Sequence, residues 1–218
     1  VRNSPALNIT YTPRRFQVYA DEFPQSRYAF VGASIDGRRH EPCELPEGGG
    51  PLVYISLGTE LNKSERFFRR CVEAFGCTGV RVVMAIGNSV RPENLGPLPP
   101  TMMVRSRVPQ LEVLSQASLF ITHGGMNSVN EALFYGVPML VVPVGNDQPT
   151  VAGRVEELGL GEALEIREAT PNVLREASMR VLSDRECHAR LSEFRQETRN
   201  AGGNTKAAKL IIEQLNRV

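Results

Sequence analysis

Apolar and polar positions follow two different patterns along most of the chain. From residue 51 onward, short continuous apolar runs alternate with stretches in which apolar side chains recur every three or four residues. The first pattern is typical of strands buried on both faces, and the second is typical of amphipathic helices. The continuous runs predict strands at 52–56, 80–86, 102–105, 119–122, 138–142 and 163–166. The periodic stretches predict helices at 63–76, 111–116, 127–135, 148–158, 171–183, 185–200 and 204–216.

This alternation of strands and helices predicts an α/β fold. Strand–helix–strand units favour a parallel sheet with helices on both faces, as in Rossmann-like domains. Ligands of such sheets bind beyond the carboxyl ends of the strands. The loops that follow residues 56, 86, 105, 122 and 142 are therefore the places to search for chemistry.

The first fifty residues have a different character. They contain five prolines and end in three consecutive glycines at 48–50. Prolines at this density interrupt regular elements, although short apolar stretches remain at 7–10 and 28–31. We therefore expect residues 1–50 to be a lead-in and interdomain linker with short strands. Residues 51–218 would form the Rossmann-like domain with its C-terminal helices.

The loop after the fourth predicted strand of this domain carries the strongest motif, His123-Gly124-Gly125-Met126-Asn127-Ser128. Two consecutive glycines expose backbone N–H groups where a helix begins, and helix N-termini attract phosphate. The side chains of His123, Asn127 and Ser128 can donate hydrogen bonds to the same anion. Taken singly, the histidine could be structural, and Asn127 or Ser128 could cap the helix. Their occurrence together on one loop favours a phosphate site.

Glu131 lies one helical turn beyond Asn127. A carboxylate there would repel phosphate but suits the two hydroxyls of a ribose, unless it is a solvated helix residue. Pro109 starts the preceding helix, where proline is common at the first position. Just before this helix, the backbone of Val108 could form hydrogen bonds with the edge of a pyrimidine base, with Gln110 nearby. Hydrogen-bond donors for a phosphate, beside a carboxylate that can accept from ribose hydroxyls, indicate a nucleotide-binding site.

Two further loops offer polar groups at strand ends. Gly58 and Thr59 follow the first strand of the domain, where a glycine lets the backbone approach a ligand and Thr59 adds a hydroxyl. A plain turn is an equal alternative. Asp147 and Gln148 follow the fifth strand, and an adjacent carboxylate and amide suit the vicinal hydroxyls of a sugar. Asp147 could instead cap the next helix.

Composition narrows the range of functions. The chain has 25 Lys plus Arg and 24 Asp plus Glu, a net charge of +1, which argues against nucleic-acid or membrane-surface binding. We expect no membrane span, because no run approaches about 18 apolar residues. Four dispersed cysteines and three scattered histidines predict reduced thiols, no metal site and a cytoplasmic protein. The first ten residues lack a signal-peptide pattern, and the initial Val favours a fragment of a longer protein.

Several segments resemble inverting UDP-glycosyltransferases, and most closely the bacterial macrolide-type enzymes. They are VPQLEVL, FITHGGMNSVNEALFYGVPMLVVPVGNDQ and RVEELGLG, with FVGAS and YISLGT fitting the same family. Members of that family have the GT-B architecture, in which two Rossmann-like domains enclose the active site. The resemblance covers nearly the whole chain and is to the carboxyl-terminal, donor-binding half.

The resemblance assigns roles to individual residues. It implies that Val108 and Gln110 hold the base and that Glu131 holds the ribose. The residues that it assigns to the diphosphate are Thr59, His123, Gly125, Asn127 and Ser128. Gly58 and Gly124, from the loop argument, complete this diphosphate-binding set. Asp147 and Gln148 would hold the sugar. Plant members carry a Trp two residues before Pro-Gln, where this chain has Arg107, so selectivity for the base is expected to be looser.

The resemblance also implies what this chain lacks. The general base of the family is a His, backed by an Asp, in the amino-terminal domain, which also holds the acceptor pocket. We therefore expect no catalytic residue here. The chain would bind UDP or a UDP-sugar without a metal or other cofactor and would work with that amino-terminal domain. The intact protein would move a hexose, with UDP-glucose as the expected donor, to an acceptor hydroxyl of a small molecule.

Two alternative functions are compatible with parts of this pattern. One is a nucleotide-sugar-binding subunit that works with a separate acceptor-domain chain. The other is half of a nucleotide-sugar epimerase, which the absence of an acid/base carboxylate pair disfavours. The acceptor, the sugar and the choice between UDP and dTDP stay open at this point.

Overall fold

The computed structural model describes residues 7–35, 41–58 and 64–216. Within them lies a parallel six-stranded sheet with the strand order β5-β4-β3-β6-β7-β8. Its strands are β3 (Leu52–Ser56), β4 (Arg81–Ala85), β5 (Met102–Arg105), β6 (Leu119–Thr122), β7 (Met139–Val141) and β8 (Gly161–Ala163). Counted from β3, the order is 3-2-1-4-5-6, which is the order of dinucleotide-binding sheets. The predicted parallel α/β sheet is confirmed.

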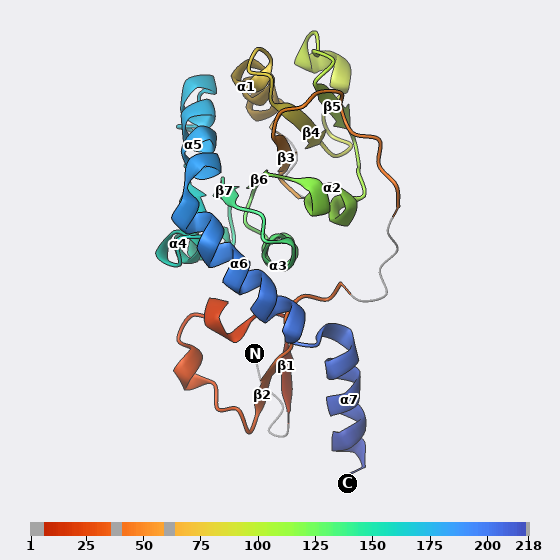
Figure 1. Ribbon diagram of the computed structural model, residues 1–218, viewed down its shortest axis with the longest axis vertical. Coiled ribbons are helices and arrows are strands. Elements are labelled where there is room, and N and C mark those ends of the chain that lie inside the picture. The colour runs from red at the N-terminus through yellow and green to blue at the C-terminus, as the bar shows by residue number, and fades with distance from the viewer. Residues whose placement is uncertain (1–6, 36–40, 59–63, 217–218) are drawn as a thin grey trace.

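Helices cover both faces of this sheet (Figure 1). They are α1 (Glu65–Phe75), α2 (Gln110–Gln116), α3 (Met126–Tyr135), α4 (Gln148–Glu157), α5 (Pro171–Ser183), α6 (Arg185–Asn200) and α7 (Gly203–Leu215), with short 3-10 turns η1 (Arg14–Phe16), η2 (Ala20–Glu22) and η3 (Pro92–Leu95). Helices α1 and α5 contribute to one apolar layer. Helices α2, α3, α4 and α6 contribute to the other.

The central strand β3 shows why its sequence is apolar throughout. Val53 and Ile55 belong to the layer under α1 and α5, whereas Leu52 and Tyr54 belong to the opposite layer. All four side chains are buried. A strand between two helical layers has no solvent-facing side, so its sequence shows a continuous run instead of an alternation.

The predicted boundary of the last strand was wrong. The sequence placed it at 163–166, but β8 spans Gly161–Ala163. Gly161 lies so close to β7 that a Cβ atom on it would overlap the carbonyl oxygen of Met139. A glycine therefore enters the strand here, whereas Gly159, with φ +62°, forms the turn after α4.

The amino-terminal residues form a small sheet of their own. Strands β1 (Asn8–Thr10) and β2 (Tyr28–Phe30) pair in parallel, which confirms the two short strands expected in the lead-in. Helix α6 runs from the main sheet toward this pair, and α7 follows at the same end of the molecule (Figure 1). The Gly203 N–H at the start of α7 donates to the Val31 carbonyl at 2.7 Å.

Hydrogen bonds also tie the amino-terminal residues to the main domain. The Arg154 guanidinium on α4 donates to the carbonyl oxygens of Phe16 at 3.0 Å and Arg15 at 2.7 Å. Asn130 on α3 donates its side-chain amide to the Tyr11 carbonyl at 2.8 Å. The lead-in is therefore anchored on α3 and α4.

Three general properties can be read from the described residues. The four cysteines all carry free thiols, as predicted. The described part of the chain contains no helix with the length and apolar character needed to cross a membrane. It also contains no cluster of three or more His, Cys, Asp or Glu side chains suited to a metal ion.

Candidate functional site

The loops with candidate chemistry meet at one edge of the sheet. Ser56 of β3 pairs with Thr122 of β6, and Thr122 pairs with Val141 of β7, so the three strands end level with one another. Strands β3 and β6 are neighbours at the point where the chain order of the sheet reverses. A crevice forms outside the strand ends at such a point and is the usual ligand site of open α/β sheets.

His123 brings two of these loops into contact. A Cβ atom on Gly58 would lie 2.7 Å from both Cε1 and Nε2 of the imidazole, and one on Gly125 would lie 2.6 Å from Nε2. Both distances are too short for any real side chain. Gly58 also has φ +77°, which favours glycine. A side chain at either position would therefore push the imidazole out of its present place.

The environment of His123 favours a neutral ring. Its Nδ1 is buried and makes no hydrogen bond within the described residues. Burial lowers the pKa of His123 below the ordinary value of 6.5, and the negative charge of Asp147 opposes that shift. At neutral pH the imidazole therefore offers one N–H donor and one acceptor nitrogen. The influence of Asp147 also shows that the loop after β7 lies near this histidine.

The start of α3 lacks a side-chain cap. Gly125 occupies the N-cap position, and within the described residues this helix start has no side-chain capping hydrogen bond. The plainer explanation for Asn127 and Ser128, that one of them caps the helix, is therefore not met. Gly124 has φ +87°, and its N–H donates to the Thr122 hydroxyl at 3.3 Å. Gly124 therefore shapes the loop, and its N–H already has a partner within the loop.

Glu131 is a buried residue, not a solvated helix residue. It is 5% exposed, and its Oε2 accepts a 2.6 Å hydrogen bond from the Gln110 side-chain amide. The same amide nitrogen donates to the Ser128 hydroxyl at 3.2 Å. Gln110 and Glu131, predicted to hold the nucleoside, and Ser128, predicted to hold the diphosphate, thus form one connected group.

Tyr54 completes this group and was missed by the sequence analysis. Its hydroxyl donates to Oε1 of Gln110 at 2.9 Å. A tyrosine inside a continuous apolar run of a central strand is indistinguishable from an ordinary core residue. No signal in the sequence could have revealed this contact, because 56 positions separate the two residues.

Asp147 and Gln148 lie side by side in sequence but in different environments. Asp147 is exposed and occupies the N-cap position of α4, yet its side chain makes no capping hydrogen bond. Gln148 is 4% exposed, and its Oε1 accepts from the backbone N–H groups of Val144 at 2.8 Å and Gly145 at 3.1 Å. Gln148 therefore holds the loop that presents Asp147, and its amide NH2 group is the part suited to a ligand.

The remaining predicted residues border this group. Val108 is buried just before α2 and shares an apolar cluster with Tyr54. Asn127 is exposed in the first turn of α3. Thr59, which was assigned to the diphosphate, lies outside the described residues.

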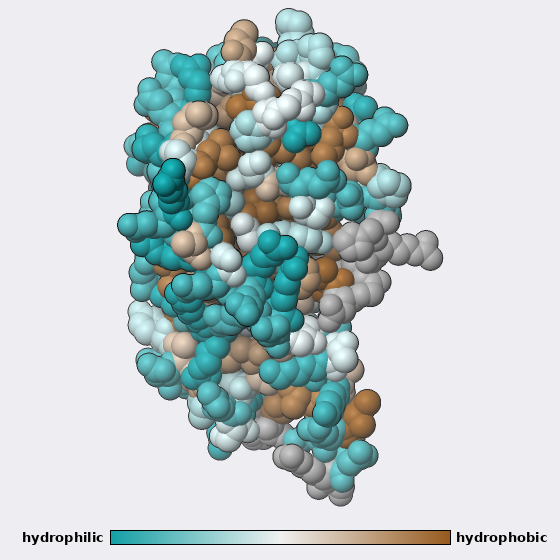
Figure 2. Space-filling view, viewed as in Figure 1, coloured by the Kyte–Doolittle hydropathy of each residue, from teal (hydrophilic) through white to brown (hydrophobic). Residues whose placement is uncertain are grey.

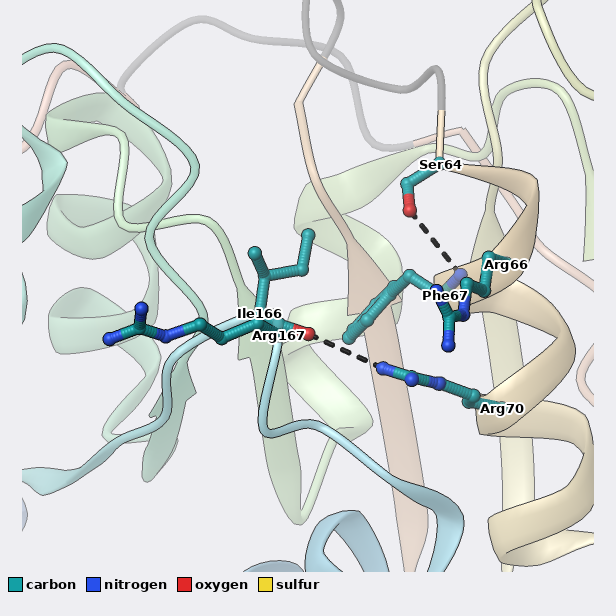
Figure 3. Close-up of a pocket in the computed structure, with 6 residues that line it drawn as sticks. All are labelled: Ser64, Arg66, Phe67, Arg70, Ile166 and Arg167. Atoms are coloured by element: carbon teal, nitrogen blue, oxygen red, sulfur yellow. Dashed lines mark hydrogen bonds between the residues drawn. The ribbon is translucent and has the colours of Figure 1, made fainter.

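A separate cavity of about 240 Å³ lies between α1 and the loop before α5 (Figure 3). Two of the polar side chains that line it have structural partners. Arg70 donates to the carbonyl oxygens of Ile166 and Ala169, and the Ser64 hydroxyl caps α1 by accepting from Phe67 N–H. A wider hollow of about 820 Å³ lies between residues 44–47 and β5. The predicted site residues line neither space.

The sheet order defines a Rossmann-like domain, and the solved structures that it resembles are glycosyltransferases of the GT-B class. The matching family model is described as "Erythromycin biosynthesis protein CIII-like, C-terminal domain" and covers residues 69–213. The chain belongs to this family. The family and the fold predicted from the sequence are thereby confirmed.

Individual relatives agree with this assignment. The chain is 42% identical over 208 residues to NDP-glycosyltransferase YjiC of Bacillus licheniformis, covering 94% of this chain and 52% of that protein. It is 37% identical over 213 residues to oleandomycin glycosyltransferase of Streptomyces antibioticus, with 97% and 50% covered. The crystal structure of the glycotransferase of kitacinnamycin matches with a TM-score of 0.89 and 40% identity, over 96% of this chain and 55% of that one. The chain therefore spans about half the length of these relatives.

Proposed function

We propose that this chain is the donor-binding half of an inverting glycosyltransferase and that it binds the UDP moiety of a UDP-sugar. The observation that carries the proposal is the contact of the His123 imidazole with the backbone at Gly58 and Gly125. This contact holds a neutral hydrogen-bond donor beside an uncapped helix N-terminus at the reversal point of the sheet. Such an arrangement suits the diphosphate of a nucleotide.

The other groups fit the remaining parts of the donor. Glu131 would accept from the ribose hydroxyls, and Val108 with Gln110 would contact the base. Asp147 would accept from sugar hydroxyls, with Gln148 donating its amide NH2 group. No cofactor is needed, because the helix N-terminus and the neutral donors would stabilise the leaving diphosphate without a metal ion.

We further propose that the whole protein transfers a hexose, with UDP-glucose as the donor, to a hydroxyl of a small acceptor. Direct displacement of UDP requires a base that removes the acceptor proton. A second, amino-terminal domain would supply this base and the acceptor pocket. Support comes from two relatives about twice as long as this chain, both named as glycosyltransferases.

The end of the molecule that contains β1, β2 and α7 offers a surface for that second domain (Figure 1). The pair β1–β2 is an isolated two-stranded parallel sheet, and parallel sheets are normally larger and covered on both faces. Helix α7 exposes Ile211, Ile212 and Leu215 nearby. Figure 2 shows apolar surface at this end, where Figure 1 places α7. The length of these relatives, about twice that of this chain, favours a single polypeptide over a separate acceptor subunit.

Calorimetric titration with UDP, dTDP and UDP-glucose, each with and without EDTA, tests the proposal. We expect UDP and UDP-glucose each to bind as tightly with EDTA as without it. The variant His123→Ala should bind both about tenfold to hundredfold more weakly, because it loses a hydrogen bond to a charged group. Failure of UDP to bind would contradict the function, and binding that needs added magnesium would contradict the metal-free site.

A further inference from the structure

Tyr54 is a buried polar residue at the base of the candidate site. Its side chain is 1% exposed, and its ring stacks on Phe120 of the neighbouring strand β6 with centroids 4.8 Å apart and planes 7° from parallel. Burial raises the pKa of Tyr54 far above its ordinary value. The hydroxyl therefore stays protonated and is held in place by a rigid ring.

This hydroxyl contributes to the orientation of the Gln110 amide. It donates to Oε1 of Gln110 at 2.9 Å, which leaves the NH2 group to face Ser128 and Glu131. The opposite orientation would place the amide oxygen against the Glu131 carboxylate, two acceptors in contact. Tyr54 and Glu131 therefore favour the same orientation from opposite ends of the amide.

The oriented amide in turn positions groups on α3. Its 2.6 Å hydrogen bond fixes the Glu131 carboxylate, whose two oxygens can together accept about four hydrogen bonds. The Ser128 oxygen accepts from the same amide, so its own proton points elsewhere and can be donated. One chain of hydrogen bonds thus runs from the strand interior to the proposed ribose and diphosphate subsites.

We propose that Tyr54 is a positioning residue, which orients Gln110 and through it the Glu131 carboxylate for the hydroxyls of a ribose. This inference rests on the proposed UDP-binding function. It assigns the preference for a ribonucleotide over a 2′-deoxyribonucleotide to a residue that touches no ligand. Pre-organised groups bind better because less freedom is lost when the ligand arrives.

The test is a comparison of UDP with 2′-deoxy-UDP in calorimetric titrations of the whole chain. Tyr54→Phe keeps the buried ring and removes the hydroxyl. We expect it to weaken UDP about threefold to tenfold and 2′-deoxy-UDP less than about twofold, so that the ribose preference shrinks. In a Gln110→Ala background, Tyr54→Phe should have no further effect on either ligand. Tyr135→Phe, which removes a hydroxyl near the end of α3, is the matched control and should leave the preference unchanged.

The outcomes separate this inference from the proposed function. Normal UDP binding with an unchanged ribose preference in Tyr54→Phe would overturn the positioning role alone. Equal weakening of both nucleotides, or the same loss with and without Gln110, would also overturn it, because a purely structural defect would behave in that way. Absence of UDP binding by the unmodified chain would overturn both proposals.

Discussion

Replacement of Gly125 by Ala probes the centre of the proposed diphosphate site. The backbone at this position has φ −63° and ψ 132°, which any residue adopts without strain. The added methyl group would lie 2.6 Å from Nε2 of His123, whereas ordinary contacts of a Cβ begin at 3.4 Å. The ring must therefore move by about 3.4 − 2.6 = 0.8 Å. Gly58 also touches this edge of the ring, so the movement must carry Nε2 away from its present position.

The size of the effect follows from hydrogen-bond geometry. A donor about 2.9 Å from a phosphate oxygen passes out of hydrogen-bond range when it moves by roughly 0.8 Å. Loss of a hydrogen bond to a charged group costs about 1.5–3 kcal/mol, which is about a tenfold to hundredfold loss of UDP affinity. Stability should change little, because Ala in place of Gly at an N-cap costs about 1 kcal/mol or less. In a domain of this size that corresponds to roughly 2–4 °C in Tm.

Three variants and one double variant make the measurement decisive. UDP affinity is measured by calorimetry and Tm by thermal unfolding for Gly125→Ala, His123→Ala and their combination. Gly153→Ala is the control, because a methyl group on that helical glycine meets nothing within 4 Å. We expect the double variant to bind UDP as His123→Ala does, since the methyl group then has no ring to displace. Unchanged affinity in Gly125→Ala, or a further loss in the double variant, would refute the reasoning.

Further predictions concern binding of the sugar, the free energy of unfolding at acidic pH, and sugar transfer. Asp147→Ala should weaken UDP-glucose but not UDP, with an unchanged Tm because its side chain makes no capping bond; equal weakening of both ligands would remove Asp147 from the sugar site. Because burial lowers the pKa of His123, the unfolded chain binds the proton more tightly, so the free energy of unfolding should fall as pH drops below 6.5. Urea titrations should show a shallower fall for His123→Ala. The isolated chain should transfer no sugar to phenolic or macrolide acceptors, and sustained transfer by the pure chain would contradict the assignment of the base to another domain.

The fold could be predicted largely because its signals are local. The run 52–56 indicates a doubly covered strand by itself, and the alternation that follows implies a parallel sheet. The boundary of β8 could not be predicted in the same way. Gly161 belongs to the strand because of its close approach to Met139, a residue 22 positions earlier that is adjacent only in the folded sheet.

The same division applies to the candidate site. The loop that contains His123 and the start of α3 carries its signal within a few consecutive residues, so its chemistry could be inferred from spacing. The contact between His123 and Gly58 joins two loops that are 65 positions apart, and Gly58 alone was as consistent with a plain turn. The bond from Tyr54 to Gln110 is of the same kind. Spacing predicts which residues share an element, whereas contacts between elements depend on the sheet order.

Asp147 and Gln148 are adjacent in sequence, but their side chains have different environments in the structure. Their adjacency suggested two equivalent contacts with a sugar, but consecutive residues at a helix start point in different directions. Gln148 is directed inward, where its oxygen satisfies two backbone N–H groups of the loop after β7. Asn146, in the left-handed conformation with φ +56°, then turns the chain toward α4. The exposed carboxylate of Asp147 is therefore the better candidate for the sugar contact, and the main contribution of Gln148 is to hold that carboxylate near His123.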